Sequence, residues 1–404
     1  MALLMKPFKA FRPQKKRVEE VILPTFDNLT PQQLNKILKK TEYNFLNVVS
    51  PKAFYPNISK TNSKKHAYNH LNAMISNKIL IQEKTECFYI YRLNKYNKNQ
   101  YGIVTSIEFD EGNKKILKHE AIFKSRSTSI LETIEHTKMQ IGPVYLSYNE
   151  KINLDSIFNR YVGKKPLYKF KTAGGTTRSL WRVSDQKDIY LIKQKLSNIK
   201  KLYIADGHHR YAAIENLSKK INKKAHKKKK LSLLAAIFSK DEVNILSFHR
   251  LVKFKKFNKK SFLHGLKNTF LLKRESKFTT PCKPGSIMMY VKSQWYNISL
   301  HSNDKVYSKF ETDVDIIEKI IIKNIANKKS GNLVSSLTNL PGKFAYKKLV
   351  REVNDGRADA GFFICPLPMK KIMSIADRGM IVPKKSTYFD PKPADGLVNL
   401  QMDF

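Results

Sequence analysis

The chain has few cysteines, and this scarcity limits how it can be stabilised. It has 3 cysteines in 404 residues, Cys87, Cys282 and Cys365, far apart in the sequence. No two of them have the close spacing of a structural zinc site, and so sparse and odd a set does not make a disulfide framework. We therefore expect a protein of a reducing compartment, the cytoplasm.

The chain also lacks long apolar runs and internal repeats. No stretch of 18 or more apolar residues occurs, so the sequence predicts no transmembrane helix. The apolar stretch before Lys6 is too short for a signal peptide. Because hydrophobic residues make up 41% of the chain and aromatic residues 11%, we expect a folded protein with room for two or three domains.

Acidic residues are scarce too: 33 of them stand against 76 lysines and arginines, a formal net charge of +43. A basic surface attracts phosphate backbones with little sequence preference. The excess is nearly all lysine, which occurs together with asparagine and isoleucine, the residues that AT-rich codons produce. Arginines interleaved with aromatic residues, which are more typical of base recognition, are missing. We expect incidental, salt-sensitive binding to polyanions rather than a specific nucleic-acid site.

The distribution of strand and helix patterns divides the chain into three regions, 1–150, 151–255 and 256–404. In the first, Thr30 and Pro31 are typical of a helix start, and residues 87–91 and 102–109 read as strands joined by the polar stretch 94–100. The patterns predict a mixed α/β (α+β) fold.

The other two regions continue the mixed pattern. The second holds expected strands at 143–148, 179–183 and 231–239, a Gly174-Gly175 turn and a helix at 185–196. The third has expected strands at 286–291 and 295–300, helices at 314–325 and 344–353, and then an irregular, proline-rich tail.

One stretch of the second region reads as a chemical site. The apolar run 202–205 predicts a short buried strand, Asp206-Gly207 a turn, and the residues from His208 onward a helix. A strand, a glycine turn and a helix start direct free backbone N–H groups and the helix dipole at an anion.

The side chains of this stretch suit a nucleotide and its cation. Arg210 could bind a phosphate with two parallel hydrogen bonds, and Asp206 could hold Mg²⁺ or orient a hydroxyl. Two alternatives remain open. The stretch could be a solvated surface turn, or His208 and His209 could be metal ligands, although neighbouring side chains on a turn rarely converge on one ion.

Asp206-Gly207-His208-His209-Arg210-Tyr211 after a strand resembles the signature of a widespread, largely uncharacterised family of microbial proteins. That family is related to the archaeal free L-serine kinases and, more distantly, to the ParB/sulfiredoxin-like fold. Further stretches that resemble the family occur in the expected order: residues 6–13, 44–48, 119–120, 180–183, 249–250 and 382–389. The resemblance implies a ParB/sulfiredoxin-like central core at 151–255, flanked by mixed α/β regions.

Departures from the relatives narrow the chemistry that the resemblance implies. Sulfiredoxins have a nucleophilic cysteine where this chain has His208, so thiol repair lacks its essential group. ParB proteins resemble Gly-Glu-Arg-Arg at this place, whereas His208-His209-Arg210 is closer to the free serine kinases. The resemblance therefore implies ATP or ADP held by Gly207, His208, His209 and Arg210, with Asp206 binding Mg²⁺ and Asp206 and His209 taking part in catalysis.

Three other family-like stretches offer residues with open roles. Glu120 could be a general base for a substrate hydroxyl, or form an ion pair at a strand end. Arg250, after the strand expected at 243–248, could bind a phosphate or pair with a carboxylate. The segment 384–389 could clamp a substrate, or Tyr388 and Phe389 could anchor it to the core.

Together these features predict a nucleotide- and Mg²⁺-dependent phosphotransferase. Its acceptor would be a small hydroxylated metabolite, with serine as one candidate, because phosphoryl transfer needs positioned phosphates, a cation and a group that accepts the hydroxyl proton. The alternative is a ParB-like nucleotide-binding protein that acts on nucleic acid or a protein partner without turnover. A base within reach of the phosphates distinguishes the first function from the second.

Overall fold

The computed structural model describes residues 3–23, 42–109, 114–223, 228–300, 311–329 and 334–404. The chain forms two compact units. Unit 1 consists of Met1–Lys118, Ile122–Val243 and Pro391–Phe404, and unit 2 of His119–Ala121 and Asn244–Asp390. The helix expected at Thr30 lies outside the described residues, and the division at residues 150 and 255 stays a prediction.

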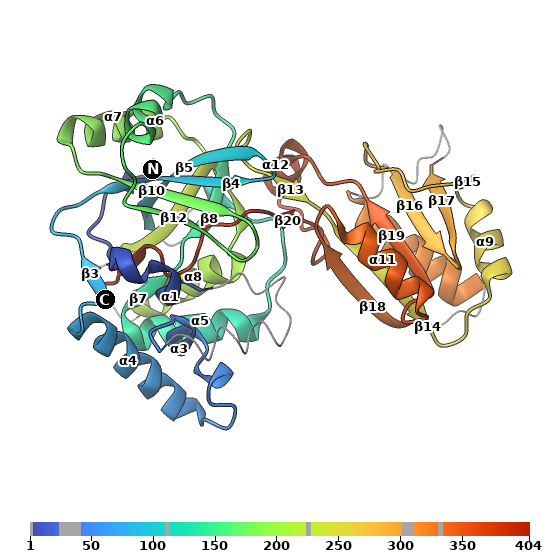
Figure 1. The fold of residues 1–404 in the computed structure, drawn as a ribbon, viewed down its shortest axis with the longest axis horizontal. Coiled ribbons are helices and arrows are strands. Elements are labelled where there is room, and N and C mark those ends of the chain that lie inside the picture. Colours follow the sequence, from blue (N-terminus) through green and yellow to red (C-terminus); the bar gives the residue numbers. More distant parts are fainter. Residues whose placement is uncertain (1–2, 24–41, 110–113, 224–227, 301–310, 330–333) are drawn as a thin grey trace. The chain divides into compact units, whose positions relative to one another are not determined.

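Unit 1 is built on a mixed nine-stranded sheet with the order β6-β11-β8-β12-β5-β4-β10-β9, to which β1 adds beside β5 (Figure 1). The β11–β6 and β12–β8 pairs are parallel and the others antiparallel. The strands of this sheet are β1 (Met5–Lys6), β4 (Phe88–Lys95), β5 (Lys98–Phe109), β6 (Ile116–Leu117), β8 (Val144–Tyr148), β9 (Tyr168–Lys171), β10 (Thr177–Val183), β11 (Leu202–Asp206) and β12 (Leu231–Ser239).

A second, four-stranded sheet of unit 1 joins segments that are far apart in the sequence, in the order β3-β2-β21-β7. These strands are β2 (Phe11–Pro13), β3 (Leu80–Gln82), β7 (Met139–Ile141) and β21 (Asn399–Gln401). The helices of unit 1 are η1 (Lys15–Arg17), α1 (Val18–Val21), α3 (Leu46–Val49), η3 (Pro51–Ala53), α4 (Lys60–Ser76), α5 (Lys124–Thr137), α6 (Asp155–Val162), α7 (Gln186–Leu196) and α8 (His208–Asn222), where η1 and η3 are 3-10 helices.

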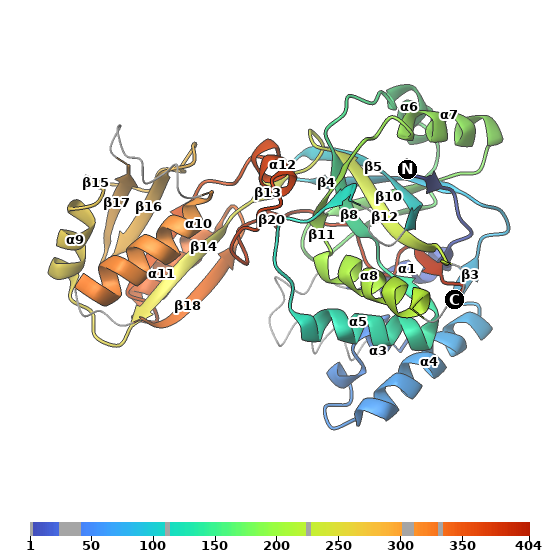
Figure 2. The same cartoon turned by 180° about the vertical axis from the view of Figure 1, so that it is seen from behind.

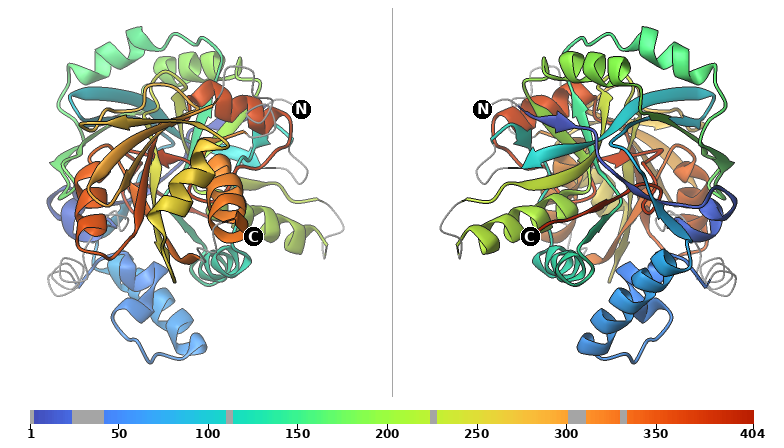
Figure 3. Two further views of the ribbon diagram at one scale, coloured as in Figure 1. Left: turned by 90° about the vertical axis from the view of Figure 1, so that its right-hand side faces the viewer. Right: turned by 90° about the vertical axis from the view of Figure 1, so that its left-hand side faces the viewer.

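Alternation along the strands gives the nine-stranded sheet two different buried faces. One face packs its apolar side chains, such as Ile90 and Leu146, against helices α5 to α8. Figure 2 shows α5 and α8 lying next to each other, and Figure 3 shows α4 beside α5. The other face carries Tyr89, Tyr91 and Arg178, and the segments before β2 and before β21 contact it.

Unit 2 contains a six-stranded antiparallel sheet of order β15-β17-β16-β19-β14-β18 and the two-stranded β13-β20. Its strands are β13 (Ile245–Leu246), β14 (Phe248–Phe254), β15 (Leu271–Glu275), β16 (Ser286–Val291), β17 (Gln294–Ser299), β18 (Val334–Pro341), β19 (Ala360–Ile364) and β20 (Tyr388–Phe389). Its helices are α9 (Lys259–Lys267), α10 (Asp313–Asp315), the π-helix η5 (Ile316–Lys329), α11 (Ala345–Asn354) and α12 (Met369–Asp377). Helices α9 and η5 pack on one sheet face and α11 on the other.

The mixed α/β class is confirmed, and most expected elements are present within a few residues. Residues 94–100 form a shorter link than we expected, because β4 and β5 continue to a two-residue turn at Tyr96 and Asn97. Both have positive φ, the geometry of the tight hairpin turns that match strand twist. The tail after residue 353, which we expected to be irregular, contains β19, α12, β20 and β21. No helix in the described part of the chain is long and apolar enough to cross a membrane.

The expectation that His249 and Arg250 follow a strand is wrong, because both lie inside β14. His249 and Arg250 interrupt the apolar pattern of this strand. The alternate positions Phe248, Val252 and Phe254 are nevertheless apolar, as expected for a strand. His249 stacks on Phe363, and its ring nitrogens contact the Gly342 carbonyl and the Ile364 N–H. Burial lowers the pKa of His249 to about 3, so the ring is a neutral part of the core.

Asp313 of unit 2 is 4% exposed, and burial raises its pKa to about 6, although the Gly285 N–H bonds its Oδ1 at 2.7 Å. A carboxyl with a raised pKa stabilises the fold fully below its unfolded pKa of 3.8, and this contribution is lost as pH rises through 6. We predict that Asp313→Asn, which keeps the acceptor for Gly285, reduces the loss of unfolding free energy between pH 4.5 and pH 8 by up to about 2 kcal/mol. Urea denaturation at both pH values measures this. Parallel profiles for the wild type and the variant would contradict it, and the exposed Asp241→Asn is the control.

Candidate functional site

The predicted strand, glycine turn and helix start at Asp206 are all present. Strand β11 is buried from Leu202 to Ala205 and ends at the partly exposed Asp206. Gly207 is the N-cap of α8, which begins at His208, and the first turn of the helix contains no acidic residue. The N–H groups at this end therefore carry the positive end of the helix dipole with no acidic side chain in the turn to neutralise it.

Gly207 is required by its conformation and by its surroundings. Its φ of +95° is in the left-handed region, which residues with a Cβ rarely adopt. A Cβ on Gly207 would also lie 3.1 Å from Arg210 Nε and 3.4 Å from Val144 Cα. The backbone at the start of α8 thus lies directly against the Arg210 guanidinium.

Four charged side chains form a continuous chain of ion pairs beside this turn. Lys392 Nζ lies 3.1 Å from Asp206 Oδ1, and Asp206 Oδ2 lies 3.5 Å from Arg210 Nη2. Arg210 Nη1 in turn donates to Asp395 Oδ1. The four side chains are between 21% and 32% exposed, so solvent reaches all of them. We call Lys392, Asp206, Arg210 and Asp395 the ion-pair chain.

The sequence did not indicate Lys392 or Asp395, because both lie about 190 residues from Asp206. They reach it on the segment 391–404, which returns to unit 1 after unit 2. This segment is held by the Tyr91 hydroxyl, which accepts the Ala394 N–H at 3.1 Å, and by the Asp395 carbonyl, which accepts the Leu23 N–H at 3.0 Å. Asp395-Gly396 repeats the Asp-Gly pair of residues 206–207, but Asp355-Gly356 does so too, so the pair alone does not single out Asp395.

Gly142 allows Arg210 and Asp395 to meet. A Cβ on Gly142, whose φ is +85°, would lie 2.1 Å from Asp395 Oδ1 and 2.8 Å from Arg210 Nη1. Any other residue at this position would displace the ion pair. The glycine before β8 is therefore part of the site, although it has no side chain of its own.

The two carboxylates of the ion-pair chain have pKa values that are shifted in opposite directions. Burial opposes ionisation of Asp206, but the charges of Lys392 and Arg210 and the Lys392 hydrogen bond lower its pKa to about 2. Burial raises the pKa of Asp395, an effect that its partner Arg210 only partly offsets. One carboxylate is thus firmly ionised, while the other is more basic than usual.

The two histidines of the turn have different surroundings. His208 is 6% exposed, and burial lowers its pKa to about 4, so the ring is neutral at neutral pH. His209 Nε2 accepts the Phe123 N–H at 3.0 Å, and the two rings stack with their planes 3° apart. Because Nε2 accepts a hydrogen bond, neutral His209 carries its proton on Nδ1.

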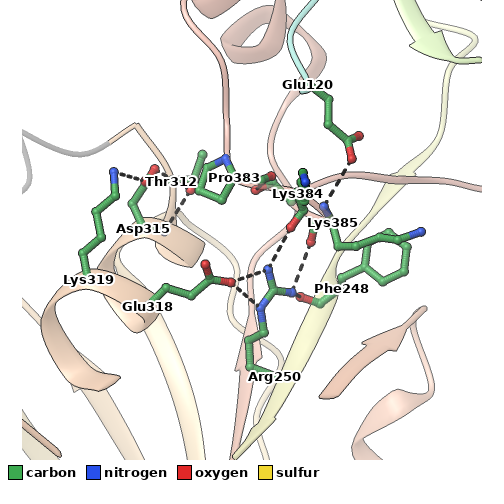
Figure 4. A network of polar contacts seen from close by, with 11 residues as sticks. Glu120, Phe248, Arg250, Thr312, Asp315, Glu318, Lys319, Pro383, Lys384 and Lys385 are labelled. Carbon is green, nitrogen blue, oxygen red and sulfur yellow. Dashed lines mark hydrogen bonds and ion pairs between the residues drawn. The ribbon is translucent and has the colours of Figure 1, made fainter. Parts of the chain in front are cut away.

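The other predicted site residues lie in unit 2, where three family-like segments meet. Glu120 Oε1 accepts the Lys385 N–H at 3.4 Å, and the His119 ring lies 3.3 Å from the Thr387 hydroxyl (Figure 4 shows the Glu120 contact). The His119 carbonyl also accepts the Val382 N–H. These contacts attach residues 119–120 to the segment 382–389.

Arg250 holds the same segment from β14 (Figure 4). Its guanidinium is 0% exposed and bonds Glu318 at 3.0 Å and the carbonyls of Phe248, Lys385 and Lys384 at 2.9, 3.1 and 3.4 Å. Tyr388 and Phe389 are buried as well. Arg250 therefore pairs with a carboxylate, and the segment 384–389 is anchored to the core. Both arrangements are the alternatives to ligand binding that the sequence left open.

Among the described residues, no group of three or more histidine, cysteine or acidic side chains could hold a metal ion by itself. Asp206 and Asp395 remain as two carboxylates on either side of Arg210. A protein site for Mg²⁺ commonly supplies only one or two carboxylates, and substrate phosphates and waters complete the coordination. The residues present fit that pattern rather than a complete cage.

The chain belongs to a family described as Protein of unknown function (DUF1015), whose model matches residues 5–322. The resemblance that the sequence motifs carry, to a family without an assigned reaction, is thereby confirmed. A search of curated proteins gave no match.

Solved structures provide distant likenesses. A free serine kinase in complex with AMP is 13% identical, with 71% of this chain and 86% of that chain covered and a TM-score of 0.36. SbnI with a C-terminal truncation from Staphylococcus aureus is 14% identical, with 70% and 82% covered and a TM-score of 0.37. A conserved hypothetical protein from Pyrococcus furiosus is 14% identical, with 72% and 94% covered and a TM-score of 0.35. Likenesses at this level carry no argument about activity or ligands.

The requirement for glycine at position 207 gives a testable prediction. Gly207→Ala should lower the free energy of unfolding by more than Gly175→Ala. Both residues have positive φ, which costs a residue with a Cβ about 1–2 kcal/mol. Only the Cβ at position 207 also meets neighbouring atoms, since nothing lies within 4 Å of one at position 175. Urea denaturation of the two variants measures the difference, and an equal or smaller loss for Gly207→Ala would contradict the close packing against Arg210.

Proposed function

We propose that this protein is a nucleotide- and Mg²⁺-dependent phosphotransferase that acts on a small hydroxylated metabolite, as a free-serine kinase does. The observation that carries the proposal is the start of α8, which has no acidic residue in its first turn, next to the ionised Asp206. A positive helix end and a carboxylate within one turn are what a phosphate group with its cation needs. The sequence resemblance to free serine kinases supports the same chemistry.

In this proposal ATP or ADP binds with its phosphates at the backbone of Gly207, His208 and His209. The His209 ring would stay against Phe123, which it contacts through its Nε2 hydrogen bond and by stacking. Arg210 would add positive charge while it holds Asp206 and Asp395 in position. Arg250 receives no role in nucleotide binding, since its guanidinium is fully buried and engaged.

Asp206 would be the protein ligand of Mg²⁺. Its low pKa keeps it ionised across the physiological range, as a ligand for a hard cation must be. Lys392 would help to balance the charge of the carboxylate until the cation binds. When bound, Mg²⁺ would neutralise the charge that develops on the transferred phosphoryl group.

Two carboxylates are candidates for the base that accepts the hydroxyl proton of the acceptor. Asp395 is the stronger one, because its raised pKa next to the lowered pKa of Asp206 is the division found between an acid–base group and a charge-stabilising group. Glu120, which the sequence also offers as a base, lies in unit 2, where its carboxylate accepts the Lys385 N–H.

One observation favours the alternative function, a nucleotide-binding protein that acts on nucleic acid or a protein partner without turnover. Arg210 pairs directly with Asp395, and this pairing makes the carboxylate a weaker base than burial alone would make it. A binding protein needs no base, so this pairing would not impair it.

We predict that Asp206→Ala and Arg210→Ala each weaken nucleotide binding at least tenfold. A charge-assisted contact is worth about 1.5–3 kcal/mol. Asp206→Ala removes the proposed contact to the cation, and Arg210→Ala removes both a positive charge and the group that holds the two carboxylates in position. Arg210→Lys should also weaken binding, because lysine cannot hold both carboxylates. Calorimetric titration with ATP, ADP and CTP in the presence of Mg²⁺ measures the affinities. Wild-type affinity in the variants would contradict the site, absence of binding by the wild type would contradict the function, and the exposed Arg357→Ala is the control.

Asp395→Asn distinguishes the enzyme from the binding protein. The amide keeps an oxygen for Arg210 but cannot accept a proton, so we predict nucleotide affinity within a few-fold of the wild type and a loss of phosphoryl transfer of about 10²-fold or more. Transfer of labelled phosphate from ATP to a pool of hydroxylated metabolites measures the rate. Unchanged transfer would exclude Asp395 as the base, and no transfer by the wild type would favour the binding protein.

A further inference from the structure

Arg178 on β10 is a buried cation without a counter-ion. Its side chain is 2% exposed, and its Nη1 donates one hydrogen bond to the Lys392 carbonyl at 2.7 Å. Its Nε is buried and has no hydrogen-bond partner. Within the described ranges, no carboxylate forms an ion pair with it.

Three other buried or partly buried arginines have a carboxylate partner, unlike Arg178. Arg250 pairs with Glu318, Arg12 with Glu83, and Arg210 with Asp206 and Asp395. Arg92, which is partly buried, has no ion pair among the described residues, but its guanidinium lies 5.2 Å from the Trp181 ring centroid. A guanidinium stays protonated in proteins, so burial without an anion is strongly unfavourable unless a ligand supplies one. The surroundings of Arg178 are therefore those of a residue whose anionic partner is a ligand.

Arg178 lies next to the candidate site. Its side chain is on the sheet face that carries Tyr91, and both side chains bond to the segment before β21: Arg178 to Lys392 O and Tyr91 to Ala394 N. The ammonium of the same Lys392 lies 3.1 Å from Asp206 Oδ1. A single residue therefore connects Arg178 to the ion-pair chain.

Within the ion-pair chain and Arg178, positive charges outnumber negative ones. In the ion-pair chain, two carboxylates stand against two cations, so the four side chains together are neutral. Arg178 adds one positive charge, and the start of α8 adds the positive end of its dipole. The excess matches a ligand group with a negative charge.

We infer that Arg178 binds an oxyanion group, a carboxylate or a phosphate, of a ligand of this site. The planar guanidinium suits both, because each presents two oxygens to its parallel N–H groups. That this ligand is the phosphoryl acceptor rests on the proposed function; that Arg178 binds an anion does not.

Thermal melting of the full chain tests the inference with three probes: inorganic phosphate, acetate, and ADP with Mg²⁺. Phosphate or acetate should raise the melting temperature of the wild type, because a ligand that binds the folded state stabilises it by mass action. Arg178→Met should abolish this shift, and Arg178→Lys should weaken the apparent affinity about tenfold. Without ligand, Arg178→Met should melt at or above the wild-type temperature, because it removes an uncompensated charge.

Arg182→Met is the matched control. Arg182 lies on the same strand and the same sheet face, but it already pairs with Glu83 at 2.9 Å. This variant should keep the shift with phosphate or acetate. The anion that acts on the wild type but not on Arg178→Met identifies the group as phosphate or carboxylate.

Two results would overturn the inference. One is that neither anion stabilises the wild type. The other is that Arg178→Met melts well below the wild type and keeps its anion shift, which would make Arg178 a structural tie to Lys392. The ADP arm reports on the proposed function separately. If ADP stabilises both the wild type and Arg178→Met, the proposed function is supported whatever the effect of phosphate and acetate. If ADP stabilises neither protein, the proposed function is contradicted, but the role of Arg178 is not.

Discussion

The pairing of Arg210 with Asp206 and Asp395 is the interaction on which the candidate site depends. It joins the start of α8, the end of β11 and a segment from the far end of the sequence. Exposed ion pairs contribute little, because water screens them, whereas removal of one partner from a buried pair costs several kcal/mol. The side chains of the ion-pair chain are partly exposed, so they lie between the exposed and the buried case. We therefore attribute to the pairing the positions of the carboxylates and part of the low pKa of Asp206, more than the overall stability of unit 1.

Local features of the site could be predicted from the sequence, and long-range features could not. The apolar run before Asp206, the Asp-Gly pair and the helical pattern after it predicted β11, the turn and α8, because short-range geometry determines each of them. Lys392 and Asp395 were missed, since nothing in a single sequence indicates which distant segment returns to a strand end. Arg178 was missed for the same reason, as its lack of a counter-ion is visible only once its neighbours are known.

The family-like motifs illustrate how one residue type serves different purposes. Arg210 and Arg250 both stand beside histidines and both were predicted to bind phosphate. Arg210 lies at a helix start and is reached by solvent, whereas Arg250 lies within β14 and bonds carbonyls of the segment 382–389. The position of Arg250 within β14 decides this, because both faces of that strand are buried and solvent does not reach the side chain. A motif thus indicates which residue type is present, and the element that carries the residue determines whether solvent or other parts of the chain surround its side chain.

The return of the chain to unit 1 after residue 390 has a consequence for how the protein is made. The Asn399 amide bonds the Phe11 carbonyl, a contact between residues 388 apart in sequence, and β21 joins β2 in one sheet. Contacts of such separation form late, because a long loop must close before they stabilise anything. During synthesis the strands and helices of residues 80–240 emerge early, but the carboxylate and the ammonium that complete the ion-pair chain emerge only with residues 392–395. A nascent chain therefore cannot acquire the complete site until residue 395 has been translated, and a product that ends at unit 2 would lack it.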